Sequence, residues 1–231
     1  MTLASCDSRK TAGENPFFTE WDTPHGVPPF DKILPEHFMP AFERGMSLHE
    51  AEIDAITSNK DEATFENTIL AYDDAGQMLA QTELVFGMLC AAETNDRMQA
   101  LQEQAMPLLA AHRDKIRLDD KLFVRVKEVY DRRAALGLDA EQMRLLQKTY
   151  DSFVRAGALL DAEQKARLKE INGQLSLTAV KFGNNILAEN NNFVLELKSD
   201  ELDGLPAGIR DAAREKARQM GKGDKWVFTL H

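Results

Sequence analysis

PEHFMPAFERGMSLHEAEIDAITS, residues 35–58, is the stretch that sets the fold class. Pro35 suits the first turn of a helix, where the N–H that proline lacks would have no helical partner. Apolar side chains then recur at helical spacing with charged residues between them, at Phe38, Phe42, Met46 and Ile53. This spacing predicts an amphipathic helix that packs one face on its neighbours.

The helical period continues to about residue 190, and polar break and cap signals divide it into further helices. These signals are Asn59–Asp61, Thr94–Asp96, Asp119–Asp120, Asp139 and Asp161. We expect one helix, capped by Thr64 or Asp61, to run through Gly76 to the break at Thr94. Pro107 should kink or divide the next helix. The helix after Asp161 should be long, with Leu168, Ile171, Leu175, Phe182 and Ile186 on one face.

After Asn192 the apolar period changes from 3.6 to 2. Phe193–Leu197 and Trp226–Leu230 alternate in the manner of short strands, and a helix is expected at about 207–219 between them. The sequence therefore predicts a mainly α fold: an antiparallel multi-helix bundle with a short strand–helix–strand element at the C-terminus.

Domain organisation follows from these changes of pattern. Residues 1–15 are small and polar and read as a disordered leader or a lipoprotein-like tether. Residues 16–34 are rich in proline and aromatic side chains, which predicts an extended strap pinned on the helices. Residues 35–190 form the helical domain, and 191–231 look like the start of a following unit.

Composition narrows the function classes. The chain has 38 acidic and 28 basic residues and a formal charge of −10. Binding to nucleic acid needs a concentrated surface of Lys and Arg, so we expect no nucleic-acid partner. No apolar run approaches the roughly 20 residues that a membrane-spanning helix requires.

Cys6 is a candidate lipidation site. Leu3-Ala4-Ser5-Cys6 has the form of a bacterial lipobox, although only five residues precede the cysteine and they include neither a basic region nor an apolar one. If Cys6 is lipidated, membrane anchoring and a location in the cell envelope, periplasmic or lipid-anchored, follow. If the match is a coincidence, a cytoplasmic location follows. The other cysteine, Cys90, lies in an apolar helical stretch and reads as a core residue.

A search for catalytic or metal-binding residues finds none. His49-Glu50-Ala51-Glu52-Ile53 comes nearest to the H-E-x-x-H helix of zinc peptidases, but Ile53 stands where the second histidine is needed. We therefore interpret His49 and Glu50 as charged residues on a solvated helix face. The remaining histidines, His25, His37, His112 and His231, are scattered, and each is interpreted as a surface or loop residue. No nucleophile elbow or phosphate-binding loop is present, so no catalytic, cofactor-binding or metal residue is assigned.

Seven segments in order give the chain a distinctive signature. They are Asn15–Phe18 with Trp21 and Thr23-Pro24, Pro28–Ile33, Glu36–Phe42, Thr64–Ile69, Gly137–Asp139, Tyr150–Gly157 and Trp226–Leu230. Together they resemble the N-terminal region of bacterial peptidyl-dipeptidases of the Dcp type, in the thimet-oligopeptidase family of zinc metallopeptidases. The resemblance covers nearly everything from Asn15 to His231.

The resemblance implies a role without chemistry for this chain. The family's zinc helix lies in the C-terminal part, so zinc is expected in the parent enzyme and no cofactor in these residues. The N-terminal helices of the family form one wall of a deep channel that admits short unstructured peptides. The implied partners are the C-terminal catalytic domain of the same polypeptide and short peptides that lose C-terminal dipeptides.

Two alternatives to this enzyme-domain interpretation stay open at the level of sequence. The chain could be a free-standing helical module that binds peptides or proteins. It could also be a lipid-anchored envelope protein with a purely structural role. An H-E-x-x-H motif further along the parent gene would decide against the free-standing module.

Overall fold

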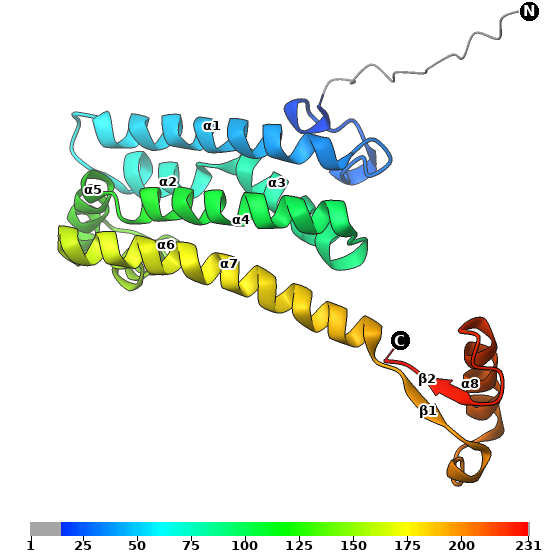
Figure 1. Ribbon diagram of the computed structural model, residues 1–231. Helices are drawn as coiled ribbons and strands as arrows, with labels where there is room; N and C mark the ends of the chain where they lie inside the picture. The colour runs from blue at the N-terminus through cyan, green and yellow to red at the C-terminus, as the bar shows by residue number, and fades with distance from the viewer. Residues whose placement is uncertain (1–14, 231) are drawn as a thin grey trace, which may run out of the picture. The chain divides into compact units, whose positions relative to one another are not determined.

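The structure is a computed structural model that describes residues 15–230, and it confirms a mainly α fold with one small sheet (Figure 1). Short 3-10 turns and one π turn, Phe65–Leu70, lie between the main elements. None of the helices between residues 15 and 230 is both long and apolar enough to cross a bilayer. The elements are α1 Phe38–Ser58, α2 Ala71–Asp74, α3 Gln77–Ala92, α4 Asp96–Arg117, α5 Asp120–Asp131, α6 Ala140–Arg155, α7 Ala162–Asn192, β1 Leu195–Leu197, α8 Ala207–Gln219 and β2 Trp226–Phe228.

The chain divides into two compact units, one up to Leu177 and one from Thr178. The division falls inside α7, which is 31 residues long and continuous, as its sequence predicted. The second unit therefore contains the C-terminal part of α7 as well as the strand–helix–strand segment, whereas the sequence placed the change of unit at 190.

The first unit holds two hydrophobic clusters. The strap cluster joins residues before α1 to α1, α3 and α4: Phe17, Ile33, Phe38, Ala41, Phe42, Leu79, Val85, Phe86, Met98, Ala105 and Leu109. The α5 cluster joins the end of α1 and the π turn to α5 and α6: Ile53, Ile56, Ala63, Phe65, Ile69, Ile116, Leu122, Phe123, Val126, Val129, Leu146, Phe153 and Ala158. Burial of the larger of these side chains, at about 1.5–3 kcal/mol each, is the main force that holds the helices together.

Local signals placed several helix ends correctly. The Asp139 carboxylate accepts from the Gln142 N–H at 2.9 Å, and the Gln142 side chain accepts from the Asp139 N–H at 3.1 Å. Asp161 and Gln164 repeat this reciprocal capping at 2.8 and 3.3 Å. The likeness of the two helix starts is therefore shared cap chemistry, as the sequence indicated.

One helix prediction was wrong, and one of the two effects expected of Pro107, division of the helix, is absent. The helix expected from Thr64 to Thr94 is broken, because Ala75 is extended and Gly76 has a left-handed φ of +78°. Glycine adopts that conformation without a steric penalty, so the chain turns there. Pro107, in contrast, does not divide α4, which continues from Asp96 to Arg117. The helix spans the missing N–H because Ala105 and Leu109 on either side are anchored in the strap cluster.

The segment 16–34 is less extended than predicted. Two 3-10 turns, Pro16–Phe18 and Pro24–Gly26, interrupt it, each with proline at its first position. Phe17 is buried, and its ring lies 5.3 Å from that of Phe38 and 6.1 Å from that of Trp21. The aromatic side chains thus pin the segment on α1.

The second unit is a small αβ element. Strands β1 and β2 pair antiparallel, with Glu196 opposite Val227. Val227 is buried and β2 packs on α8, which contributes the buried Ala213 and Ala217. The Glu196 carboxylate on the sheet is paired with Lys222 and Lys225. Helix α8 therefore covers the second strand.

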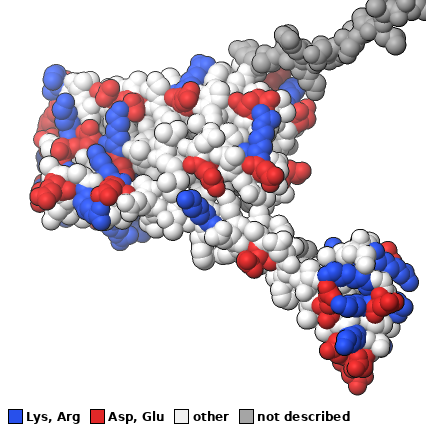
Figure 2. Space-filling model, in the orientation of Figure 1, with Lys and Arg blue, Asp and Glu red and all other residues white. Residues whose placement is uncertain are grey.

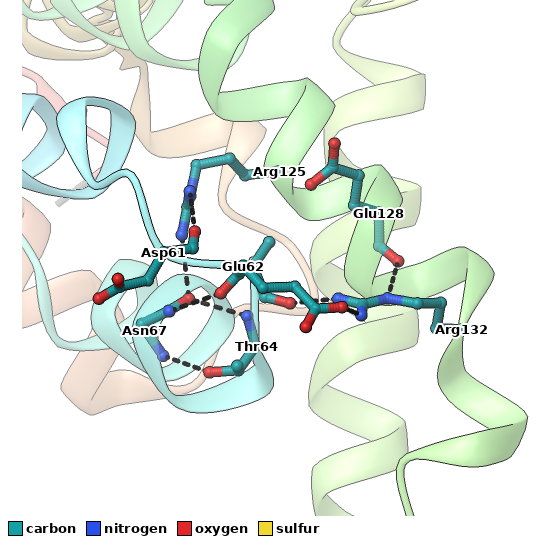
Figure 3. A network of polar contacts seen from close by, with 8 residues as sticks. Asp61, Glu62, Thr64, Asn67, Arg125, Glu128 and Arg132 are labelled. Carbon is teal, nitrogen blue, oxygen red and sulfur yellow. Dashed lines mark hydrogen bonds and ion pairs between the residues drawn. The ribbon is translucent and has the colours of Figure 1, made fainter.

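Arg125 of α5 and Arg132, which follows the last residue of this helix, fasten the chain between α1 and α2 (Figure 3). The Arg125 guanidinium donates to the carbonyl oxygens of Asn59 at 3.0 Å and Asp61 at 3.2 Å, and to the Asn67 side-chain oxygen at 3.1 Å. The same Asn67 oxygen accepts from the Thr64 N–H at 2.8 Å, which caps the π turn. At the C-terminal end of α5, Arg132 donates to the carbonyl oxygen of Ala63 and pairs with Glu62.

We predict that Arg125→Met lowers the free energy of unfolding by about 2–4 kcal/mol, because partly buried carbonyl oxygens lose their donor. Denaturation in urea, followed by circular dichroism, measures the change. Lys127→Met is the matched control on α5. Lys127 makes only an exposed pair with Asp131, so its loss should cost less than about 1 kcal/mol. Equal stability of the two variants would refute the anchoring role of Arg125.

Candidate functional site

Two histidines from distant parts of the sequence meet at the contact between α1 and α4. The Nε2 atom of His112 lies 3.0 Å from the Nδ1 atom of His49, and the ring centroids are 5.0 Å apart. The His112 side chain is only 3% exposed. The interpretation of these two histidines as separate surface residues was therefore wrong, because helix packing joins residues 63 positions apart.

A carboxylate and a lysine border the histidine pair. The Glu50 carboxylate lies 3.5 Å from the Nδ1 atom of His112, which has no hydrogen-bond partner. The other oxygen of Glu50 lies 2.8 Å from the ammonium of Lys115. Glu50 thus stands between a positive charge and a buried imidazole nitrogen.

The turn at Gly76 closes the other side of the site. Its N–H donates to the Glu52 carboxylate at 2.7 Å. A Cβ atom on Gly76 would lie 3.0 Å from the Nδ1 atom of His49, which is closer than nearly all real contacts. Only glycine therefore gives both the left-handed turn and the space for the imidazole.

The His112 side chain lines two small pockets. A pocket of about 180 Å³ is lined by His49, Gly76, Glu83 and His112 among others. A second pocket of about 390 Å³ is lined by Glu50, His112 and Lys115 among others. His112 therefore lines both pockets, whereas His49 lines the smaller one.

The surroundings favour neutral imidazoles. Burial lowers the pKa of His49, and the neighbouring His112 lowers it further, while Glu52 and Glu50 oppose the shift. Burial also lowers the pKa of His112, which Glu50 raises and Lys115 lowers. The Lys115 ammonium holds the pKa of Glu50 below its usual range. Glu50 therefore keeps its charge at pH values where the imidazoles titrate.

This arrangement can bind and release protons, but it does not fit a zinc centre. A catalytic zinc site takes three protein ligands and a water. Between residues 15 and 230, no group of three or more His, Cys, Asp or Glu residues is placed to hold a metal ion. Glu50, the carboxylate nearest to His112, is engaged by Lys115, whose charge would repel a cation.

The other residues singled out in the sequence have separate settings. His25 lies in an exposed turn with φ of +59°, and His37 accepts from the Leu34 N–H at 3.1 Å. Cys90 is partly buried against the strap cluster, which confirms it as a core residue, and burial raises its pKa. Cys6 and His231 lie outside the described residues.

One face of α7 carries exposed apolar side chains, both in the part of the helix that belongs to the first unit and in the part that belongs to the second. The residues of α7 predicted to share a face are largely exposed: Ile171 42%, Leu175 62%, Phe182 66% and Ile186 46%. In Figure 2 the visible stretch of α7 is mostly white, whereas Lys, Arg, Asp and Glu are interspersed elsewhere on the first unit. The helical spacing predicted that these residues share a face of α7. No other part of the chain that the structure describes buries that face.

A wide hollow of about 750 Å³ lies between the segment before α1 and helix α3. Phe18, Trp21, Met78 and Leu84 contribute apolar lining, and the Arg44 guanidinium stacks 4.5 Å from the centroid of the Phe18 ring. Such a surface can accept apolar side chains of a flexible ligand.

No family model matches the chain. It is 38% identical over 217 residues to a dipeptidyl carboxypeptidase of Escherichia coli, an alignment that covers 94% of this chain and 32% of that protein. A dipeptidyl carboxypeptidase of Salmonella typhimurium is 36% identical with the same coverage. Oligopeptidase A of Escherichia coli is 24% identical over 196 residues, which cover 84% of this chain and 29% of that protein.

The chain thus spans about a third of the length of the curated relatives it matches. The identity to the two dipeptidyl carboxypeptidases extends over nearly all of this chain, and the weaker match to oligopeptidase A agrees with it. The chain belongs to the thimet-oligopeptidase family, as an N-terminal region of a member of the Dcp type.

Proposed function

We propose that the chain is the channel-wall and substrate-selecting domain of a zinc peptidyl-dipeptidase, an enzyme that removes dipeptides from the C-termini of short peptides. The observation that carries the proposal is the identity of 38% over 94% of the chain to a protein named dipeptidyl carboxypeptidase. Because the match covers 32% of that protein, we assign the chemistry to the remaining polypeptide and selection to these helices.

Zinc and its ligands belong, in this proposal, to the C-terminal catalytic domain. The residues between 15 and 230 do not fit a zinc site, since only two imidazoles converge and the nearest carboxylate is paired with a lysine. The hollow beside α3 supports contact with peptides, because its aromatic and methionine side chains suit ligands without fixed structure.

The exposed face of α7 is the proposed contact with the rest of the polypeptide. Leu175 and Phe182 are each more than 60% exposed, and their burial would contribute about 1.5–3 kcal/mol apiece. A partner that covers this face would bury apolar side chains that the described residues leave exposed.

We predict that the 231-residue chain, incubated with a blocked tripeptide and excess zinc, releases no dipeptide, because its described residues form no zinc site. Chromatography of the products measures release, and the full-length protein is the positive control. Zinc-dependent turnover by a pure sample of the chain would overturn the assignment of chemistry to the remaining polypeptide.

A second prediction separates the enzyme domain from the free-standing module. Leu175→Lys and Phe182→Lys should change the stability of the isolated chain by less than about 0.5 kcal/mol, because both side chains are exposed. In the full-length protein, each should lower stability by about 1–3 kcal/mol, since a lysine is then buried at the contact.

The control for this experiment is Val124→Lys on α5, at a side chain that is 53% exposed outside the α7 face. This variant should be equally tolerated in both backgrounds. If the α7 variants are also tolerated equally in both, the proposed contact with the remaining polypeptide is wrong.

We further propose that the parent protein is attached to the bacterial envelope through a lipidated Cys6, on the evidence of the preceding Leu3-Ala4-Ser5. The mass of the protein purified from its own cells should then show an acylated cysteine as the first residue. Protein that retains Met1 and an unmodified Cys6 would instead support a cytoplasmic location.

A further inference from the structure

The histidine pair occupies the polar layer between the two hydrophobic clusters. In α1, Phe42 belongs to the strap cluster and Ile53 to the α5 cluster, and His49 lies between them. In α4, Leu109 belongs to the strap cluster and Ile116 to the α5 cluster. His112 stands between those two residues, so both helices cross from one cluster to the other at their histidine.

The number of protons on the pair decides whether its hydrogen bonds can be satisfied. With both rings neutral, a single N–H lies between His49 Nδ1 and His112 Nε2, at the observed 3.0 Å. One added proton makes His112 a donor at both nitrogens, toward His49 and toward the Glu50 carboxylate 3.5 Å away. A second proton, on His49, sets two N–H groups and two positive charges against each other.

The charged groups around the pair shift the pKa values of the two imidazoles. Glu50 and Glu52 from α1 favour protonation, and Glu83 from α3 lines the same pocket as both histidines. Arg113 and Lys115 from α4 oppose protonation of His112. Arg117 and Tyr72 also line the smaller pocket, and Glu43 from α1 lines the larger pocket with His112. Glu50 already pairs with Lys115, and Glu52 accepts from the Gly76 N–H. Both carboxylates raise the pKa of His49, but burial and the neighbouring His112 outweigh them, so that pKa stays lowered.

We propose that the His49–His112 contact is a proton-operated latch between α1 and α4, closed with at most one proton on the pair and opened by the second. Opening separates the two rings and withdraws His49 from the turn at Gly76. The two pockets that flank His112 change with it. The clusters on either side stay packed, because neither histidine belongs to them.

The sign of the pH effect follows from linkage. Both histidines have a pKa below the ordinary value of 6.5 in the folded chain, so the unfolded chain binds more protons as the pH falls below that value. The stabilisation is complete above the ordinary pKa and is lost on acidification. The folding equilibrium constant falls by about tenfold for each unit by which a folded pKa lies below the unfolded one.

The test combines urea unfolding with NMR titration of the histidine rings, from about pH 7.5 to about pH 5. In wild type, the folding equilibrium constant should decrease as the pH falls. In His112→Gln, this decrease should be smaller, and the pKa of His49 should rise because the facing imidazolium is gone. That rise is a signature that a purely structural contact would not give.

His49→Gln repeats the test at the less buried partner, in case His112→Gln does not fold. His25→Asn is the control, since His25 is exposed in a left-handed turn that asparagine tolerates. The control should follow wild type at every pH. The latch is refuted if the histidine-pair variants lose stability on acidification by the same factor as wild type, or if the remaining ring titrates unchanged.

Discussion

Three elements of the first unit pass from one hydrophobic cluster to the other. The level at which they pass restricts which side chains are tolerated there. Helix α1 passes it at His49, α4 at His112, and the chain between α2 and α3 at Gly76. A side chain at this level belongs to neither cluster, so polar groups are tolerated only if they satisfy one another. The imidazole contact, the Glu52 carboxylate on the Gly76 N–H and the Glu50–Lys115 pair supply most of these contacts. The Nδ1 atom of His112 has no hydrogen-bond partner and lies 3.5 Å from Glu50.

The features that the sequence predicted are those that depend on near neighbours. The caps at Asp139 and Asp161 act over three residues, and the length of α7 follows from an unbroken period. The break at Gly76 escaped detection because Tyr72 and Leu79, on either side, are seven residues apart and keep the helical period through the turn. The apolar period shows which residues share a helix face, but it does not reveal that one residue has a left-handed φ and breaks the helix.

The candidate site could not be predicted in the same way. His49 and His112 lie on different helices, and nothing within one turn of either residue signals the other. His49 also follows the apolar Leu48 and precedes Glu50, a local pattern typical of a solvated face. For α7, the helical spacing correctly placed the apolar residues on one face. It could not predict that the described residues leave this face exposed, because spacing carries no information on what covers a face.

The proposed role as a wall that selects peptides requires a fixed shape. The position of the histidine pair is compatible with both this role and the proposed proton-operated latch. Rigidity of the first unit comes from the two clusters and from the anchors that Arg125 makes to the chain after α1. The histidines lie outside both. In the proposed latch, both clusters stay packed when the contact is released, and the response available to the helices is a shift of one cluster against the other.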